Sequence, residues 1–410
     1  MKRVFAACAV CFALCVSSPA HARITAWLDY TNFDTRLGEL AASAGVTPYS
    51  APEQLQLRAN IFADLNTIYG DYDVTFTETR PVSGDYERLV WGQTGSDGTL
   101  GLADRIDFRN LNRNDVSRIY TANFAFFVDE FDGLDNRTAQ IAQLSRGFAG
   151  TAAHELGHNI GLEHCDCYGC REITPANYAN TQGLQNRFII ATGSTGLEED
   201  GREALRSFGE WERVKLAYAD GVSRETPPVL SEQALPHDSL ATAQALTLTN
   251  LSTTDAASAL VVGGLGLSGE QDFFSFTALA GETITARVLS DVLDDRLTPF
   301  DTLMSLFSPT DALLFEDDDT QFRNNTFNVI GTYSTDTFFV NIPVTQTGTY
   351  TLAVSAFTGS ARGQYELLVA RHGAQAVVVP ESGAAFLLTL GILGGWLHLS
   401  PRRNHGIMKP

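Results

Sequence analysis

The sequence predicts an α+β protein in which a mixed α/β domain precedes an all-β sandwich. Apolar residues recur at both helical and strand spacing before residue 221, whereas residues 237–372 show only the period of two that strands require. A polar, proline-containing stretch without periodicity separates the two regions. We therefore expect a first domain at 23–221, a linker at 222–236 and a β-sandwich domain at 237–372.

The first domain is expected to alternate strands and helices. The segments that read as strands are residues 24–28, 72–76 and 119–127. Ser50 and Glu53 form a capping box, and apolar residues continue after it at helical spacing, so a helix is expected there. A second, longer helix is expected at 138–160.

The end of the longer helix carries a run of metal-binding side chains. His154 and His158 are four residues apart, so both imidazoles leave the same helical face and can bind one zinc ion. Gly161 comes where the helix must stop, because glycine tolerates the left-handed conformation that turns a chain back. His164 can then return to the metal as a third ligand. Glu155 lies beside this face, where it can hold a water and accept its proton as general base.

Two simpler interpretations compete with a catalytic zinc site. The His-Glu-x-x-His portion can arise by chance on an ordinary helix, but chance does not account for Gly161 and His164 as well. A structural zinc needs a fourth Cys or His, and three cysteines follow within reach: Cys165, Cys167 and Cys170. Three protein ligands would instead leave the fourth zinc position open for water, as hydrolysis requires.

The run from His154 to His164 resembles the metzincin clan of zinc metallopeptidases. It matches the clan's pattern His-Glu-x-x-His-x-x-Gly-x-x-His at every fixed position. The resemblance implies that His154, His158 and His164 are the zinc ligands and that Glu155 is the general base.

The clan's second mark, a methionine in a turn beneath the zinc, is missing here. Ile190 stands at the Met-turn position, and an apolar side chain of similar volume can fill the same floor. Some members carry a tyrosine two residues later, where this chain has Thr192.

Composition and the first residues indicate an exported protein. The net charge of −20 over 410 residues argues against nucleic acid and anionic lipid as partners. Residues 1–22 have the form of a signal peptide, with Lys2 and Arg3 before an apolar stretch and an Ala-His-Ala cleavage site. Since the first strand follows directly, we expect no propeptide. In an oxidising compartment we expect one short disulfide and one remaining thiol among Cys165, Cys167 and Cys170.

Four short motifs mark the all-β region. They are Gln271-Asp272-Phe273-Phe274-Ser275-Phe276, Ala280-Gly281, Asp301-Thr302-Leu303 and Gly348-Thr349-Tyr350. They resemble the bacterial pre-peptidase C-terminal domain, a secreted β-sandwich that is appended to peptidases. Five acidic side chains of this region can offer oxygen ligands to Ca²⁺, and a solvated acidic loop is the alternative: Asp272, Asp301, Asp317, Asp318 and Asp319.

Residues 373–410 resemble a sorting signal. Val379-Pro380-Glu381-Ser382 precedes an apolar run from Ala384 to Leu399, and Arg402-Arg403 follow. The pattern is similar to the PEP-CTERM signals of Gram-negative exporters, with Ser382 in place of the usual second proline. The resemblance implies transient membrane association, cleavage near Pro380 by an exosortase-like enzyme, and release to the cell surface or medium. A permanent anchor is the alternative, but sixteen helical residues span only about 24 Å of a hydrocarbon core about 30 Å thick.

These features together predict a secreted zinc-dependent endopeptidase, a hydrolase whose substrates are proteins or peptides. One alternative is a catalytically inactive surface-binding protein that keeps a structural zinc in the same scaffold, and a second, which the motif leaves open, is zinc-dependent hydrolysis of a substrate other than a peptide. Glu155 argues against the inactive alternative, because a structural site does not need a carboxylate beside the metal.

Overall fold

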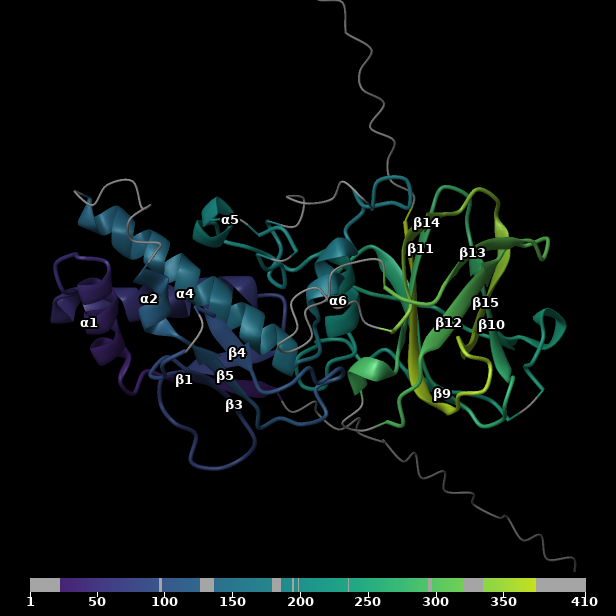
Figure 1. Ribbon diagram of the computed structural model, residues 1–410, viewed down its shortest axis with the longest axis horizontal. Coiled ribbons are helices and arrows are strands. Elements are labelled where there is room, and N and C mark those ends of the chain that lie inside the picture. The colour runs from purple at the N-terminus through teal and green to yellow at the C-terminus, as the bar shows by residue number, and fades with distance from the viewer. Residues whose placement is uncertain are drawn as a thin grey trace, which may run out of the picture. The chain divides into compact units, whose positions relative to one another are not determined.

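The structure is a computed structural model that describes residues 23–95, 98–125, 136–178, 186–193, 195–197, 199–234, 236–293, 297–320 and 335–373. The expected signal peptide lies outside these residues, and so does the sorting tail apart from Gly373. The fold is mixed α/β, with several sheets and few long helices (Figure 1). No helix in the described part of the chain combines the length and the hydropathy needed to cross a membrane.

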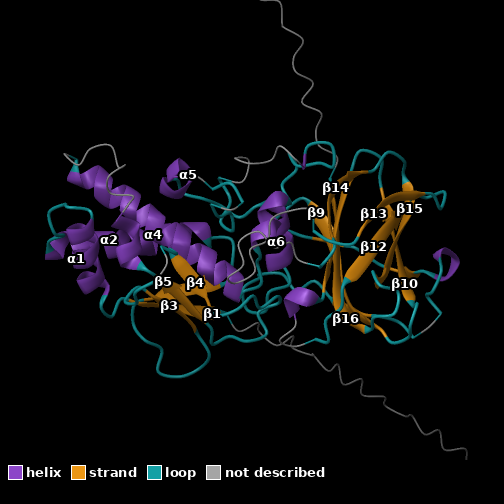
Figure 2. Cartoon of the chain, in the orientation of Figure 1, coloured by secondary structure: helices purple, strands orange, loops and turns teal. Residues whose placement is uncertain are grey.

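The N-terminal region, residues 23–223, is built on one five-stranded sheet with the order β2-β1-β3-β5-β4. Its strands are β1 (Ile24–Asp29), β2 (Val74–Thr77), β3 (Glu87–Val90), β4 (Gly101–Ala103) and β5 (Val116–Ile119). Neighbouring strands are parallel except β4, which is antiparallel to β5 and forms one edge. Helices α1 (Phe33–Ser43), α2 (Ala51–Ile68) and α4 (Arg137–Asn159) lie on one side of this sheet (Figure 2).

Most of the expected elements are confirmed, and one strand is wrong. The capping box is present, because the backbone N–H of Ser50 donates to Glu53 Oε2 over 2.7 Å at the start of α2. Instead of continuing as a strand after β5, the chain forms a short 3₁₀ helix at Thr121–Phe124. The reason is local: the Thr121 hydroxyl donates to the Trp91 carbonyl, and the Asn123 N–H donates to the Tyr120 carbonyl, which turns the chain out of the sheet.

Residues 229–372 form a β-sandwich of two sheets that share one apolar core. The first sheet has the order β13-β12-β15-β10-β7, and the second has the order β14-β11-β16-β9-β6, with β8 added to β9. The strands are β6 (Val229–Ser231), β7 (Gln244–Ala245), β8 (Thr249–Asn250), β9 (Ala256–Leu265), β10 (Gln271–Ala278), β11 (Thr283–Leu289), β12 (Thr302–Phe307), β13 (Leu313–Asp317), β14 (Phe338–Pro343), β15 (Gly348–Ala356) and β16 (Gly363–His372).

The stretch expected to be a linker, residues 222–236, already contains β6 of the sandwich. Val229–Ser231 pairs in parallel with β9, so these residues belong to the sheet and do not form a free connection. A second apolar core is continuous from the N-terminal region into the sandwich. Trp211 of helix α6 (Glu210–Leu216) packs on Phe338 of β14, with ring centroids 5.5 Å apart. The two regions are therefore joined by a buried apolar interface.

Candidate metal centre

Helix α4 presents His154 and His158 on one face and ends directly after them. The Asn136 side chain caps its first turn by accepting a hydrogen bond from Ala139 N. At the other end, Gly161 N donates to His158 O (2.9 Å) and Leu162 N donates to Gly157 O (2.8 Å). This pair of bonds is a Schellman motif, which satisfies carbonyls that a helix end leaves open.

Gly161 is required for this helix end by both its backbone and its surroundings. Its φ of 106° is one that side-chain-bearing residues rarely adopt. A Cβ at this position would lie 2.5 Å from Phe108 Cα, far inside van der Waals contact. The glycine expected from the sequence therefore lets the chain turn tightly and pass against the 107–108 backbone.

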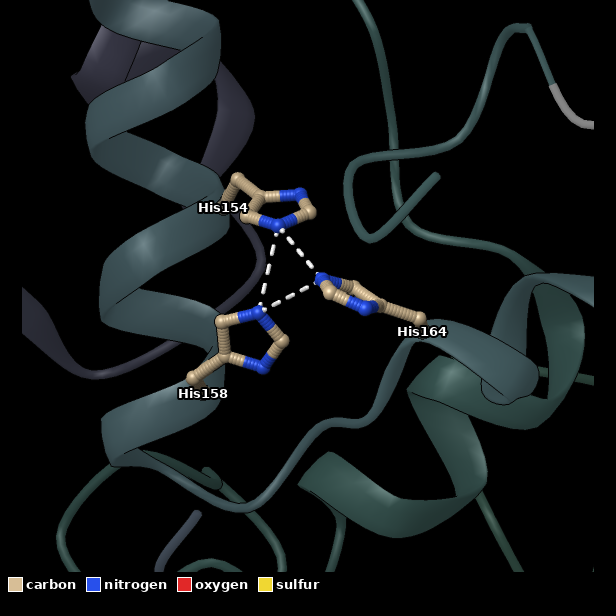
Figure 3. A group of neighbouring side chains, drawn as sticks. All are labelled: His154, His158 and His164. Carbon is tan, nitrogen blue, oxygen red and sulfur yellow. Dashed lines mark hydrogen bonds between the residues drawn. The ribbon is translucent and has the colours of Figure 1, made fainter. Parts of the chain in front are cut away.

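His164 begins a short 3₁₀ helix, η2 (His164–Tyr168), and points back at the two imidazoles on α4 (Figure 3). The Nε2 atoms of His154 and His158 are 3.1 Å apart, and His164 Nε2 lies 3.1 and 3.0 Å from them. Zinc–nitrogen bonds of about 2.0–2.1 Å in a tetrahedral site require edges of roughly 3.3 Å, close to this triangle. The three imidazoles therefore fit a single zinc ion without rearrangement.

The other ring nitrogens orient the imidazoles on α4. His154 Nδ1 lies 2.9 Å from the Ile189 carbonyl, and His158 Nδ1 lies 2.7 Å from the Leu162 carbonyl. A carbonyl only accepts, so each Nδ1 carries the proton and each Nε2 keeps its lone pair for a metal. Burial holds the pKa of His154 well below its usual range and lowers that of His158 to about 4. Both rings are therefore neutral near pH 7, as metal ligands must be.

Glu155 lies next to the triangle and is 6% exposed. Burial raises the pKa of its carboxyl to about 8, although a hydrogen bond from the Ala103 backbone and the charge of Arg206 oppose this. A Cβ on Gly101 would collide with its Oε1, so edge strand β4 passes directly against the carboxylate. A carboxyl with a pKa near neutrality, placed at a sheet edge, is suited to accept and return a proton.

Ile190, the predicted Met-turn equivalent, and Arg206, which was not predicted, both lie beside α4 below the histidines. Ile190 is fully buried, and its Cδ1 would lie 3.4 Å from a Cβ placed on Gly157 of α4. The Arg206 guanidinium donates to the carbonyls of Phe188 (3.2 Å) and Ile189 (3.0 Å), and Ile189 O also accepts from His154. Arg206 therefore holds the turn that orients a ligand, yet no motif in the sequence marks it.

Thr192 lies in the turn after Ile190 and takes part in local backbone bonding. Its N–H donates to Thr195 Oγ1 (2.6 Å), and its carbonyl accepts from Thr195 N (3.0 Å) and Leu197 N (2.7 Å). These bonds close the turn.

The expected disulfide is not formed, since Cys165, Cys167 and Cys170 are all free and buried. Cys165 and Cys167 are two residues apart on a 3₁₀ helix, so their side chains project about 120° apart and do not bridge. Cys165 Sγ instead accepts from Arg287 Nη1, and Cys167 Sγ donates to His164 O (3.0 Å). Burial raises the pKa of all three thiols, which keeps them protonated.

The five aspartates expected to share a calcium ion do not form one group, because Asp272 lies apart from the others. Asp272 on β10 and Asp317 on β13 are separated by β15 and β12, a distance of about 14 Å at the usual strand spacing of about 4.8 Å. Asp272 lies instead beside His237, whose Nε2 is 3.3 Å from Asp272 Oδ1 and 3.1 Å from Glu232 Oε1. Burial and the charges of Asp319 and Asp318 raise the pKa of Asp301, which precedes β12, so these three carboxyl groups lie near one another and away from Asp272.

Comparisons with known proteins add little to this geometry. No protein-family model matches the chain, and no curated protein matches it either. Among solved structures, it is similar to a periplasmic inhibitor of g-type lysozyme, PliG, from Aeromonas hydrophila, with 13% identity over 36% of this chain and all of that one, at a TM-score of 0.22.

Two further structures give similar values. The pre-peptidase C-terminal domain of a Bacillus anthracis collagenase is 18% identical over 33% of this chain and 99% of its own, with a TM-score of 0.20. PliG from Salmonella Typhimurium is 12% identical over 32% of this chain and 99% of its own, with a TM-score of 0.17. Likenesses with TM-scores this low do not establish a function for the chain.

Proposed function

We propose that the protein is a zinc-dependent endopeptidase that hydrolyses peptide bonds of protein or peptide substrates. The single observation that carries this proposal is the triangle of Nε2 atoms with Glu155 beside it. Among the described residues, the donor atoms that gather there come from the three imidazoles alone. A fourth zinc position would therefore be open, as in catalytic sites, whereas structural sites are closed by protein ligands.

The chemistry divides between the metal and the chain. Zinc in such a site supplies Lewis acidity, which polarises a carbonyl and makes water acidic with a pKa of about 7. Glu155 would accept the proton of the attacking water in its ionised form, which a zinc cation beside it would favour, and would return the proton to the departing amine. His154, His158 and His164 remain neutral ligands throughout.

Edge strand β4 supports a peptide as substrate. Its inner side pairs with β5, and Gly101 and Ala103 of this strand adjoin Glu155. An extended peptide that adds to a free strand edge binds through main-chain hydrogen bonds, whatever its side chains. Such binding would lay a scissile bond across the carboxylate and the metal.

The accessory parts complete the proposal. The β-sandwich would serve as an appended domain like those of secreted peptidases, as its short motifs suggest. Residues 1–22 and the Pro-Glu element of the tail support export from a Gram-negative cell and processing by an exosortase-like enzyme.

The test compares variants of the zinc-loaded full chain on an unfolded protein substrate. Glu155→Gln should keep about one zinc per chain yet lose at least about 10²-fold in rate, because only the base is removed. His158→Ala should lose the metal. Glu39→Gln is the matched control, since Glu39 is an exposed carboxylate of α1 paired with Arg36, and it should leave the rate unchanged.

Full activity in Glu155→Gln would show that this mechanism is wrong. Zinc binding without cleavage by the unaltered chain would favour the inactive surface-binding alternative.

A further inference from the structure

The third zinc ligand is not held by α4, so other residues must position it. His164 is followed by a loop that runs through Ile173, and two acidic residues flank it, Glu163 on one side and Asp166 on the other. Both carboxylates are fully buried. They are also tied to each other, because Asp166 Oδ2 accepts the Glu163 N–H over 2.7 Å. We call Glu163 and Asp166 together the acidic bracket. The position of His164 therefore depends on the contacts that hold these two residues.

Arg287 of β11, a strand of the sandwich, contacts both residues of the acidic bracket. Its guanidinium is fully buried, donates through Nη1 to Asp166 Oδ1 (3.1 Å) and Cys165 Sγ (2.7 Å), and pairs through Nη2 with Glu163 Oε2. One side chain thus contacts the residue before His164, the residue after it and the next one. Lys215 of α6 adds a second cation, with Nζ 2.8 Å from Asp166 Oδ2.

A second residue of the sandwich ties down the rest of the loop. Asn341 of β14 has a left-handed φ of 49°, and its side-chain amide donates to the carbonyls of Cys170 (2.7 Å) and Ile173 (2.8 Å). The loop that carries the third ligand is therefore fixed at both ends by strands of one sheet, β11 and β14.

A contribution to folding stability does not by itself explain why Arg287 and the acidic bracket are buried together. Burying charges carries a desolvation cost that their attraction often only balances, and apolar replacements of buried ion pairs are often as stable. Arg287 also packs on an apolar neighbour, with its guanidinium carbon 5.2 Å from the centre of the Phe338 ring. An arginine here gives two things that an apolar residue could not, directional hydrogen bonds to Cys165 and Asp166 after His164 and an ion pair with Glu163 before it.

We propose that the β-sandwich is an integral part of the metal centre, and that Arg287 is a positioning residue that holds His164 in the geometry zinc binding requires. The inference rests on the zinc site of the proposed function. It assigns the sandwich a role in metal affinity that is separate from any role in substrate or surface binding.

The test measures the zinc affinity of the full chain by competition with a chromogenic chelator. Arg287→Met keeps most of the volume and removes the hydrogen bonds, so zinc should bind at least about tenfold more weakly, as when outer partners of metal ligands are lost. The matched control is Arg109→Met. Arg109 also pairs across the interface, with Nη1 3.1 Å from Glu366 Oε1 of β16, but it does not contact the residues that flank His164. This control should change affinity by less than about threefold.

A double-mutant cycle separates positioning from general loosening of the fold. If Arg287 acts through His164, then adding Arg287→Met to His164→Ala should cost no further zinc affinity. An equal tenfold loss in both backgrounds would overturn the inference. Arg287→Lys, which keeps a cation but not the planar fork, should give an intermediate affinity. If circular dichroism shows that Arg287→Met does not fold without zinc, the double-mutant cycle is measured with Arg287→Lys in its place.

The outcomes also separate this inference from the proposed function. Weaker zinc binding in Arg287→Met together with no peptidase activity in the unaltered chain would leave the inference standing and remove the proposed function. If Arg287→Met binds zinc with unchanged affinity and the unaltered chain shows cleavage that depends on Glu155, the proposed function would stand and the role of Arg287 would be wrong. Absence of zinc binding in the unaltered chain would overturn both.

Discussion

The two histidines on α4 and the third histidine on its loop are positioned by different means. His154 and His158 need only the turn of one helix, whose geometry places residues four apart on one face. His164 needs Gly161 to reverse the chain, and then contacts from α6 and from strands of the sandwich. The comparison shows that a short motif specifies the donor atoms but only part of their arrangement, and the rest is supplied by residues far away in the sequence.

The difference has an energetic consequence. The α4 pair is formed whenever the helix is formed, so zinc binding does not have to order it. If its contacts to distant residues were removed, the loop of His164 would become ordered only when the metal binds. The conformational entropy lost in that ordering would reduce the favourable free energy of zinc binding.

The largest expected effect is the loss of a ligand from either side of this comparison. His158→Ala should weaken zinc binding by about 10³-fold and His164→Ala by about 10²-fold, given about 10–16 kcal/mol for a complete zinc site. His158 belongs to the preformed pair, so its removal should cost more. Chelator competition with the full chain measures both. Equal losses would mean that the loop is as well formed as the helix.

A smaller effect is expected where the helix turns into the loop. Gly161→Ala should destabilise the protein by about 3 kcal/mol, because a methyl group would meet Phe108 Cα and φ would be strained. Gly147→Ala is the control on the same helix, since its Cβ would meet nothing closer than 3.6 Å, at Phe124 Cε1. This control should be neutral or stabilising by up to about 1 kcal/mol. Urea unfolding measures both, and similar values for the two variants would contradict the assigned role of Gly161.

The smallest effect is expected from the volume-conserving replacement of Ile190, in the floor beneath the α4 pair, and a charged replacement of the same residue is its contrast. Ile190→Met keeps an apolar side chain of similar volume, so the free energy of unfolding should change by less than about 1.5 kcal/mol. Ile190→Asp would place a carboxylate in a fully buried position against α4 and should abolish zinc retention. Metal analysis of the purified Ile190→Asp variant measures its zinc content. Normal zinc content would show that this turn does not support the ligands.

Local patterns predicted much of this molecule and long-range contacts almost none of it. The capping box at Ser50, the extent of α4 and the alternating strands β10, β11, β15 and β16 were all predictable, because each depends on neighbours within a few residues. Arg206 and Arg287 were not, since a lone arginine carries no periodicity, and only the folded chain shows what it contacts.

The incorrect predictions have the same origin. Proximity in sequence suggested a disulfide among the three cysteines, but the 3₁₀ helix turns Cys165 and Cys167 apart. Shared acidity suggested one calcium site, but the strand order separates Asp272 from Asp317. In both cases residue types were grouped by chemistry, while the fold separated Cys165 from Cys167 and Asp272 from the other four aspartates.

The central claim is that three imidazoles hold zinc with its fourth position open to water, and X-ray absorption at the zinc edge of the zinc-loaded full chain tests it most directly. The account predicts a shell of three nitrogens and one further light atom at about 2.0–2.1 Å, with no sulfur. A sulfur neighbour at about 2.3 Å would identify Cys165, Cys167 or Cys170 as a fourth ligand. The site would then be closed and structural, and the proposed mechanism would be wrong.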